Sequence, residues 1–450
     1  MLGIYSKKGK DVELMAIWGL LALQHRGQAA AGITLSDGKE MIIRRGMGLV
    51  NDVFAKGLPA MDAKIAIGHV RYPSKGFSLS QVNTQPLLVN YAGGQISLAN
   101  SGSLTNAKEL RDELEAQGAI FQSSIHGEII MNLISRSQAG ELHEKILDTV
   151  KKLTGSYCLT IMTNDKLIGV RDPHGFRPLC IGKLGEDGWV LAAESCALDT
   201  INATFVRDVL PGELVVIDQD GLHSHQFAQS ERQAKCIFEY VYFARPDSTL
   251  DGKSIYDARI AMGEVLARES GLKADIVISV PDSGTPAAIG FGRESGVLFA
   301  QGLIKNRYIG RTFIQPGQKF RETSVHLKLN PVSAVVKDKS VIIVDDSIVR
   351  GTTSKKIIKI LKDAGAKEVH MCISSPPVEY PCYYGIDTSE RSELIAVTKS
   401  LDEIKEFIGA DSLFYLSFKG LEEAIGAKCE NSLCTACFNG KYPTPVPCQK

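Results

Sequence analysis

The sequence predicts a mixed α/β protein whose two halves differ in architecture. From residue 1 to about 230, short alternating apolar runs separated by turns are typical of packed antiparallel sheets with helices outside them. From about 231, the apolar runs Ile276–Val280 and Val341–Val344, with helical segments between them such as Asp257–Glu269, indicate a parallel α/β sheet. We therefore expect domains at 1–230 and 231–425, with the polar stretch Gln229–Gln233 as the candidate boundary, followed by a Cys- and Pro-rich tail at 426–450.

Individual elements of the first half follow from local patterns. One helix is predicted to begin after Asn106 and to end at Gly118, with Leu110 and Leu114 on one face. Strands are predicted at Lys64–Gly68, Gln95–Leu98, Tyr157–Met162, Leu167–Val170, Trp189–Ala193 and Glu213–Ile217.

Composition narrows the class of protein. A chain of 450 residues is too long for one compact core and suggests two or three domains. Lys+Arg and Asp+Glu both number 51, so no overall charge favours a nucleic-acid partner. No apolar run reaches the ~18–20 residues of a membrane span and no secretion signal is evident, so we expect a cytoplasmic protein. Ten cysteines in that compartment favour metal ligation or burial over disulfides.

The run from Val341 to Ser354 carries the strongest chemical signal. A buried strand delivers two adjacent acids to its carboxyl end, where open α/β sheets bind ligands. Backbone N–H groups and hydroxyls of the following turn can surround a phosphate at the start of the next helix, which Gly365 ends. The alternative is that the acids only cap that helix. The candidate residues are Asp345, Asp346, Ser347, Ile348, Val349, Arg350, Gly351, Thr352 and Thr353.

This run resembles the signature of the type I phosphoribosyltransferases, which implies that the paired acids hold the ribose and Mg²⁺ of phosphoribosyl pyrophosphate (PRPP). A second strand-end turn, with Asp282, Ser283 and Gly284, can hold pyrophosphate, although it also fits an ordinary βα turn. Downstream, Lys305 and Arg307 place cations near the expected polyanion, or else form a solvated basic face.

Further strings extend the resemblance over the whole chain: Leu23-Gln-His-Arg-Gly-Gln28, Arg171-Asp-Pro-His-Gly-Phe-Arg-Pro178 and Glu239-Tyr-Val-Tyr-Phe-Ala-Arg-Pro-Asp-Ser248. The chain thereby resembles the glutamine PRPP amidotransferase (amidophosphoribosyltransferase) family of purine synthesis. The resemblance implies an N-terminal-nucleophile-hydrolase αββα sandwich followed by a type I phosphoribosyltransferase domain. It also implies Mg²⁺ at Ser283, Asp345 and Asp346, formation of 5-phosphoribosylamine and pyrophosphate, purine nucleotide effectors and a homodimer or homotetramer. A loop at about Phe320–Asn330 is expected to close over the site, and His326 stands in it where the family usually has arginine.

The first half departs from the family at its glutaminase positions. Family members begin with a nucleophilic cysteine, but this chain has Leu2 there, and no cysteine lies near it in the sequence. Ser101 replaces the asparagine beside Gly102 in the oxyanion hole, and His126 replaces the glutamine-binding aspartate. Arg71, the family's carboxylate clamp, remains, although it also fits a structural ion pair. We expect a folded half that does not hydrolyse glutamine.

Four cysteines form a candidate metal site. Cys434 and Cys437 have ligand spacing, and Cys236 and Cys382 can complete a four-thiolate set. Spacing alone leaves zinc, a [4Fe–4S] cluster and a redox pair open. The resemblance implies [4Fe–4S], which would tie the tail to the body, with Cys429 and Cys448 as alternates. The cysteines predicted to lie in the core are Cys158, Cys180, Cys196 and Cys372.

Three functions are compatible with these residues. The first is an enzyme that forms 5-phosphoribosylamine from PRPP and ammonia rather than glutamine. The second transfers the phosphoribosyl group to another amine. The third is a catalytically idle PRPP- or nucleotide-binding regulatory paralogue.

Overall fold

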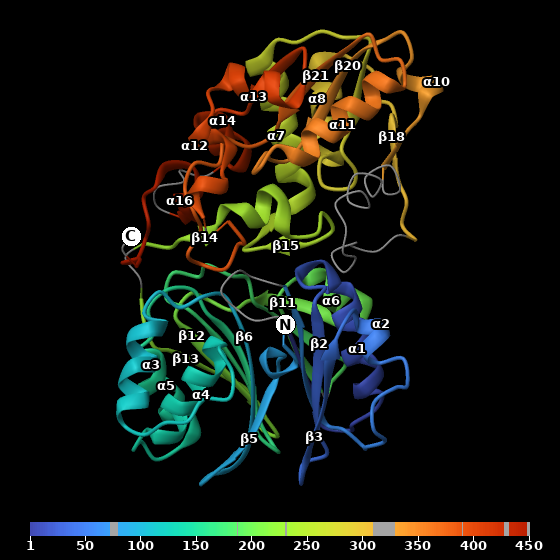
Figure 1. The fold of residues 1–450 in the computed structure, drawn as a ribbon. Helices are drawn as coiled ribbons and strands as arrows, with labels where there is room; N and C mark the ends of the chain where they lie inside the picture. The colour runs from blue at the N-terminus through green and yellow to red at the C-terminus, as the bar shows by residue number, and fades with distance from the viewer. Residues whose placement is uncertain are drawn as a thin grey trace.

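The computed structural model describes residues 1–72, 80–186, 188–229, 232–308, 329–388, 390–426 and 432–447. The two halves form separate bodies that are stacked on each other, with the N-terminus at the end of the first half that faces the second (Figure 1). No helix in the described part of the chain is both long and apolar enough to cross a membrane.

Two antiparallel sheets form the centre of the first half. The seven-stranded sheet has the order β11-β9-β10-β1-β4-β2-β3, and the six-stranded sheet has the order β13-β12-β8-β7-β6-β5. The strands are β1 (Leu2–Ser6), β2 (Ala30–Ser36), β3 (Met41–Met47), β4 (Ile65–Arg71), β5 (Leu87–Tyr91), β6 (Gly94–Ser101), β7 (Cys158–Met162), β8 (Leu167–Arg171), β9 (Cys180–Leu184), β10 (Gly188–Ala192), β11 (Thr204–Asp208), β12 (Glu213–Asp218) and β13 (Gly221–Gln226). Each strand predicted from the sequence of this half is present.

Helices cover the outer faces of both sheets, which gives the αββα sandwich (Figure 1). The helices are α1 (Val12–Ala22), α2 (Val50–Val53), α3 (Ala107–Ala116), α4 (His126–Arg136), α5 (Leu142–Val150) and α6 (Ser195–Thr200), with 3₁₀ turns η1 (Gln24–Arg26) and η2 (Gln81–Asn83). The predicted helix after Asn106 is α3, and its Leu110 and Leu114 are buried as expected. A core between the sheets includes Met1 and Cys158, and further cores separate each sheet from its helices.

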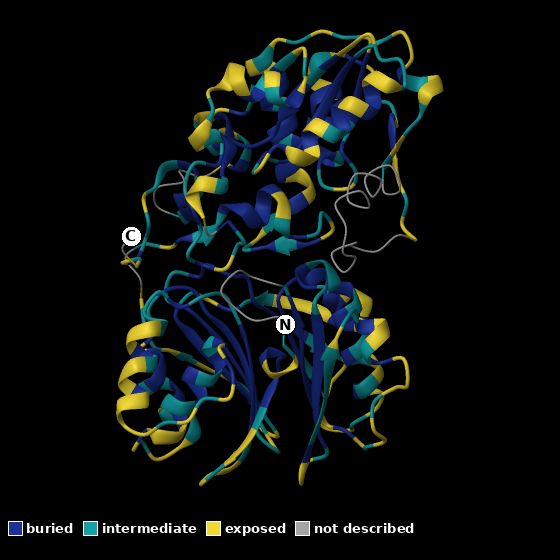
Figure 2. Cartoon of the chain, viewed as in Figure 1, coloured by how far each residue is buried: buried dark blue, intermediate teal, exposed yellow. Residues whose placement is uncertain are grey.

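The second half contains the predicted parallel sheet, with the order β17-β20-β21-β22. Its strands are β17 (Ile276–Ser279), β20 (Ser340–Asp345), β21 (Glu368–Ile373) and β22 (Ser412–Tyr415). Residues of β20 alternate between two cores: Ile342 and Val344 pack with α7 (Ile255–Ser270), α8 (Thr285–Ser295) and α14 (Phe418–Ile425), whereas Val341 and Ile343 pack with α11 (Thr352–Asp363) and α13 (Leu401–Ile408). Both faces are therefore buried, as Figure 2 shows, which explains the continuous apolar run of β20.

Short elements complete the second half and the tail. They are η3 (Glu239–Phe243), which is a π-helix, β15 (Thr249–Leu250), β16 (Lys253–Ser254), β18 (Leu303–Lys305), β19 (Leu329–Pro331), α10 (Ser333–Val336), η4 (Arg391–Glu393), α12 (Ile395–Thr398) and α16 (Ala436–Asn439). The tail is attached to the body by a short parallel ladder between β14 (Lys235–Cys236) and β23 (Leu433–Cys434).

Candidate active site and domain junction

The two adjacent acids lie at the carboxyl end of β20, as the sequence predicts. Asp345 and Asp346 are both buried, and Ser347 Oγ donates a hydrogen bond to Asp346 Oδ1 at 2.6 Å. Burial and then the charge of Asp346 raise the pKa of Asp345 well above its ordinary value. Two buried carboxylates in this position are fully ionised only when a cation offsets their charge. The pair therefore has the chemistry of a divalent-cation or sugar-hydroxyl site.

The turn after the acids leads directly into α11. Gly351 has φ 73°, a left-handed conformation that strains other residues, and a Cβ there would lie 2.6 Å from the Ile395 side chain. Helix α11 begins at Thr352, so Thr352 and Thr353 lie in its first turn rather than in the preceding loop, where the sequence had placed them. Free N–H groups of that turn point towards the loop, where they favour an anion.

The second strand-end turn lies beside the acid pair. A Cβ on Gly284 would be 2.5 Å from Val344 O and 3.2 Å from Asp345 Cα, so only glycine permits this approach. Lys305 Nζ also reaches this turn and forms an ion pair with Asp282 at 2.7 Å. The structure thus brings together two turns and a cation that are separated in the sequence.

Other predicted residues are placed differently. Arg350 is paired with Glu393, with Nε donating to Oε2 at 2.9 Å, so its guanidinium is already bound to an acid. Arg307 is exposed, and Ser283 is partly buried. Of the expected closing loop, only its last two residues lie within the described part, and His326 lies outside it. Within the described ranges, no three His, Cys, Asp or Glu side chains converge closely enough to hold a metal ion.

A buried ionic cluster joins the halves, and sequence reasoning missed it. Arg26 of the first half donates two hydrogen bonds to Glu239 of the second, at 2.6 and 3.0 Å, and Arg177 donates a third at 2.8 Å. In return, Glu194 accepts hydrogen bonds from Arg245 N at 2.9 Å and from Ser248 Oγ at 2.7 Å. We call these residues the junction cluster.

The junction cluster contains two arginines and two glutamates that are almost fully buried. Arg26 also pairs with Glu194, and His25 Nε2 donates to Glu194 at 2.5 Å. Burial opposes ionisation, but Arg26 and His25 hold the pKa of Glu194 below its ordinary range. Except for Glu194, these residues belong to the three motifs quoted for the family resemblance. In this structure, each of the three motifs therefore contributes residues to the contact between the halves. The signal in the sequence that could have revealed the junction cluster is the grouping of charged residues within apolar surroundings in those strings.

Comparisons with known proteins match each half of the chain to a known family. Residues 74–200 match the family described as "Glutamine amidotransferase domain", and residues 251–405 match "Phosphoribosyl transferase domain". Amidophosphoribosyltransferase from Archaeoglobus fulgidus is 48% identical over 99% of this chain and 98% of the relative. The Bacillus subtilis amidophosphoribosyltransferase is 48% identical over 97% of this chain and 92% of the relative. The chain belongs to the amidophosphoribosyltransferase family.

Solved structures support the same assignment. Glutamine PRPP amidotransferase from B. subtilis, complexed with ADP and GMP, has a TM-score of 0.93 and 45% identity, with 99% of this chain and 97% of that chain covered. A structure described as the allosteric regulatory enzyme of purine biosynthesis has a TM-score of 0.92 and 46% identity, with 99% of this chain and 96% of that chain covered. The αββα and phosphoribosyltransferase folds expected from the sequence are therefore confirmed.

Leu2, which the resemblance assigns to the nucleophile position, is packed hydrocarbon in this member of the amidophosphoribosyltransferase family. Leu2 is 1% exposed, in the middle of the seven-stranded sheet, and its side chain packs over Gly19 of α1. Met1 is 3% exposed, and Ala193 N donates to its carbonyl at 3.1 Å. Burial first and Arg26 second lower the pKa of the Met1 α-amino group from 8.0 to about 5.

The other residues that the resemblance assigns to this pocket are His126, Ser101, Gly102 and Arg71. His126 begins α4, and its Nδ1 accepts a hydrogen bond from Leu104 N at 3.1 Å. Burial lowers the pKa of His126 to about 4, so it is uncharged near neutral pH and supplies no negative charge for an ammonium group. Ser101 ends β6, and Gly102 follows with φ 107°. Arg71 is buried at the end of β4.

The fold corrects the expectation that no cysteine lies near the N-terminal residues. Although no cysteine is near Leu2 in the sequence, strand β7 brings Cys158 into the same core cluster as Met1. The Cys158 thiol donates to Arg177 O at 3.3 Å, and burial raises its pKa to about 12. It therefore stays a protonated core thiol rather than a nucleophile. Cys180, Cys196 and Cys372 are also buried, as predicted.

The four predicted ligand cysteines line one apolar cavity. Cys236, Cys382, Cys434 and Cys437 share it with aromatic side chains that include Phe176 and Tyr384, whose rings stack at 4.1 Å. Cys236 and Cys434 are register partners in the β14–β23 ladder. In this structure the sulfurs line the cavity without forming a metal-binding group among the described residues. The alternates Cys429 and Cys448 lie outside the described residues.

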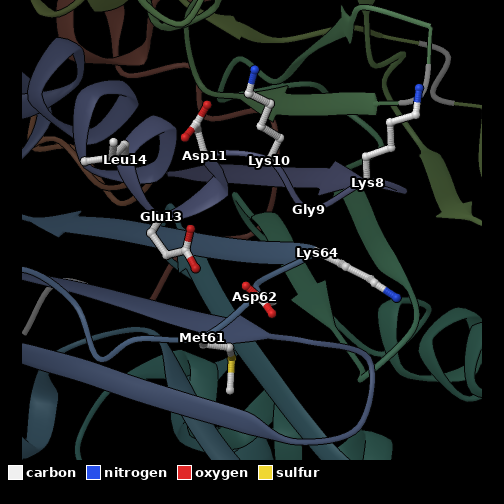
Figure 3. A pocket seen from close by; sticks show the side chains of 9 residues that line it. All are labelled: Lys8, Gly9, Lys10, Asp11, Glu13, Leu14, Met61, Asp62 and Lys64. Carbon is white, nitrogen blue, oxygen red and sulfur yellow. The ribbon is translucent and has the colours of Figure 1, made fainter.

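A separate open hollow lies on the surface of the first half (Figure 3). Its charged lining residues are balanced in sign, namely Lys8, Lys10, Lys64, Asp11, Glu13 and Asp62. The three ammonium groups lie well apart rather than facing one point (Figure 3). This hollow has no feature of a polyanion site.

Proposed function

We propose that this protein transfers the phosphoribosyl group of PRPP to ammonia, with release of pyrophosphate, and does not hydrolyse glutamine. The observation that carries the transferase part is the juxtaposition of Asp345 and Asp346 with the Gly284 turn and the start of α11. Family membership supports the same reaction, because its relatives are amidophosphoribosyltransferases.

The residues fit Mg²⁺, which prefers oxygen ligands and usually binds through carboxylates and substrate phosphates. Asp345 and Asp346 would hold it, with Ser283 as the third candidate, and the raised pKa of Asp345 reflects a pair that requires a compensating cation. When bound, Mg²⁺ would neutralise charge on the leaving pyrophosphate. The α11 N-terminus and the loop from Ser347 would orient the 5-phosphate.

The reaction is a substitution at C1 of the ribose. The C1–O bond to pyrophosphate breaks and its electron pair leaves with pyrophosphate, while the ammonia nitrogen forms the new C1–N bond and then loses a proton. Positive charge develops on the ribose as this happens, and the acid pair would stabilise it if the sugar binds against these carboxylates. This protein's residues therefore act by positioning and electrostatics rather than as nucleophiles.

Three features support the absence of glutaminase activity. Leu2 has no nucleophilic atom, and loss of a nucleophile can cost on the order of 10⁶ in rate. His126 is neutral and already binds the Leu104 backbone. The Ser101 side chain is shorter than the asparagine that the resemblance implies at this position, and loss of one oxyanion donor costs roughly 10²–10³.

The test is Mg²⁺-dependent release of pyrophosphate from PRPP with ammonium chloride, with glutamine or with neither. We expect release with ammonium only, and loss of that release in Asp346→Asn. Release with glutamine would contradict the ammonia proposal. Binding of PRPP without release under any condition would instead support an idle regulatory protein, and release only with another amine would support transfer to that amine.

We also propose that the cysteine cavity holds a [4Fe–4S] cluster, with zinc as the alternative. Four thiols on one apolar cavity fit either group, and aromatic walls exclude solvent, as such clusters favour. The cluster would be structural, because it would link the tail to β14 and to the segment at Cys382. Iron, sulfide and zinc analysis of anaerobically purified protein decides between them, with Cys434→Ser as the variant expected to lose the metal.

Purine nucleotide effectors and a homo-oligomeric state are proposed from the family. The related B. subtilis structure contains ADP and GMP. Inhibition of pyrophosphate release by either nucleotide, and the mass of the native particle, would test these two points.

A further inference from the structure

Arg259 is a fully buried cation that the proposed reaction does not use. It lies on α7, is 2% exposed and is among the largest fully buried side chains. A buried guanidinium is costly unless its hydrogen bonds and its charge are both compensated. Its retention in the interior of the second half therefore calls for a role.

All of the hydrogen bonds described for Arg259 go to main-chain carbonyls around η3. Its Nε donates to Tyr240 O at 2.8 Å, and its Nη2 donates to Ala244 O at 2.8 Å and, more weakly, to Glu239 O at 3.4 Å. The planar guanidinium thus spans both ends of this π-helical turn. Glu239, at the start of the turn, is the residue that Arg26 and Arg177 hold from the first half.

The other side of α7 is locked to the substrate turn. A Cβ on Gly263 would overlap Ala287 O of α8, and a Cβ on Gly290 of α8 would overlap Ile260 O of α7, so the two helices touch through their backbones. Helix α8 begins immediately after the Gly284 turn. Residues of η3, α7 and α8 also share one core with Val344, which precedes the acid pair.

Acids of both halves influence the charge of Arg259. Burial lowers the pKa of Arg259, and among the acids that oppose this effect Asp346 comes first, followed by Glu194 and Glu239. The charge of Arg259 therefore interacts favourably with one acid of the pair and with both glutamates of the junction cluster.

We propose that Arg259 is a positioning residue of the transferase site, which holds η3 by its carbonyls, is linked through the α7–α8 contact to the Gly284 turn, and keeps a positive charge buried in this half. This inference rests on the proposed PRPP site. Arg259 would contribute in two ways. Its charge favours binding of the polyanionic substrate, and its planar guanidinium holds η3 in the position on which turnover depends.

Two substitutions separate these contributions in the ammonium-dependent pyrophosphate assay. Arg259→Met removes charge and donors, so we expect the KM for PRPP to rise about tenfold and kcat to fall at least about tenfold. Arg259→Lys restores the charge without the planar fork, so KM should return to near the wild-type value while kcat stays reduced. A merely structural role would lower the melting temperature of both variants and leave KM and kcat per folded site unchanged.

Matched controls make the outcomes distinct. Arg268→Met, on the same helix but exposed and paired with Glu423, should change neither constant. If Arg259→Met does not fold, Arg259→Lys alone decides, because wild-type kcat in that variant would overturn the proposal. Asp346→Asn is measured in parallel. If this variant releases pyrophosphate from PRPP normally, the proposed PRPP site itself is wrong. If Asp346→Asn is inactive but the Arg259 variants are normal, only the role of Arg259 is overturned.

Discussion

Replacement of Glu239 by Gln would remove one charge from the junction cluster while keeping the side-chain shape. Glu239 accepts two hydrogen bonds from Arg26 and one from Arg177, and all three side chains are almost fully buried. With Gln, Arg26 keeps Glu194 as its acidic partner, whereas Arg177 loses the carboxylate that it pairs with in the cluster. An amide also has one acceptor atom where the carboxylate has two, so one guanidinium N–H would face a donor.

The size of the effect follows from burial. Removal of one partner from a buried ion pair typically costs about 3–5 kcal/mol, because the other charge stays buried and uncompensated. The matched control is Glu423→Gln: Glu423 pairs with Arg268 at the surface, where the side chains are 63% and 44% exposed. Exposed pairs contribute about 1 kcal/mol or less.

Urea unfolding compares the two variants under identical conditions. Chains with two domains do not have to unfold as one unit, so intrinsic fluorescence and far-UV circular dichroism should be followed together. We expect Glu239→Gln to lower the transition midpoint several times more than Glu423→Gln does, and to separate the unfolding of the two halves. Equal shifts for the two variants would refute the claim that the junction cluster holds the halves together.

Three further predictions concern the first half and the helix contact. Leu2→Cys should release no glutamate from glutamine above background, because the proposal holds that the asparagine oxyanion donor and the acidic anchor are also missing; a glutamate burst would contradict this. Gly263→Ala should destabilise the protein by about 1–3 kcal/mol or more in thermal unfolding, since its Cβ overlaps Ala287 O, whereas Gly46→Ala, whose nearest atoms lie at 3.5 Å, should not. Finally, the pKa of the Met1 amine is about 5 in the folded protein and 8.0 for an ordinary solvated chain terminus, so the unfolded chain binds the extra proton below pH 8. The free energy of unfolding should therefore fall by roughly 2 kcal/mol between about pH 8 and about pH 6.5, and a flat profile from urea titrations would contradict the burial of this amine.

Local sequence patterns predicted much of the fold. The alternating runs of the first half and the continuous run before Asp345 each form the expected strand, because side-chain periodicity and turn residues act over a few neighbouring positions. The helix after Asn106 begins and ends at its predicted signals for the same reason. Thr352 was assigned to the loop rather than to the helix that it begins, since helix boundaries depend on cap geometry that a sequence shows only approximately.

Contacts between distant segments required the tertiary structure. Arg26 and Glu239 are 213 residues apart, and nothing in either motif says that they meet. The approach of Cys158 to Met1 likewise depends on how the two sheets pack. Arg259 reads as one more charged residue of a helix until its position beneath η3 is known.

The sequence by itself determined the residue types available to each half: paired acids and a hydroxyl-rich turn in one, and a leucine at the predicted nucleophile position in the other. Residue identity decides such properties, because no fold can add a carboxylate or a sulfur. Only the tertiary structure decided which charges compensate one another in the core. That depends on burial and on distances between segments far apart in the chain, which are properties of the packed molecule.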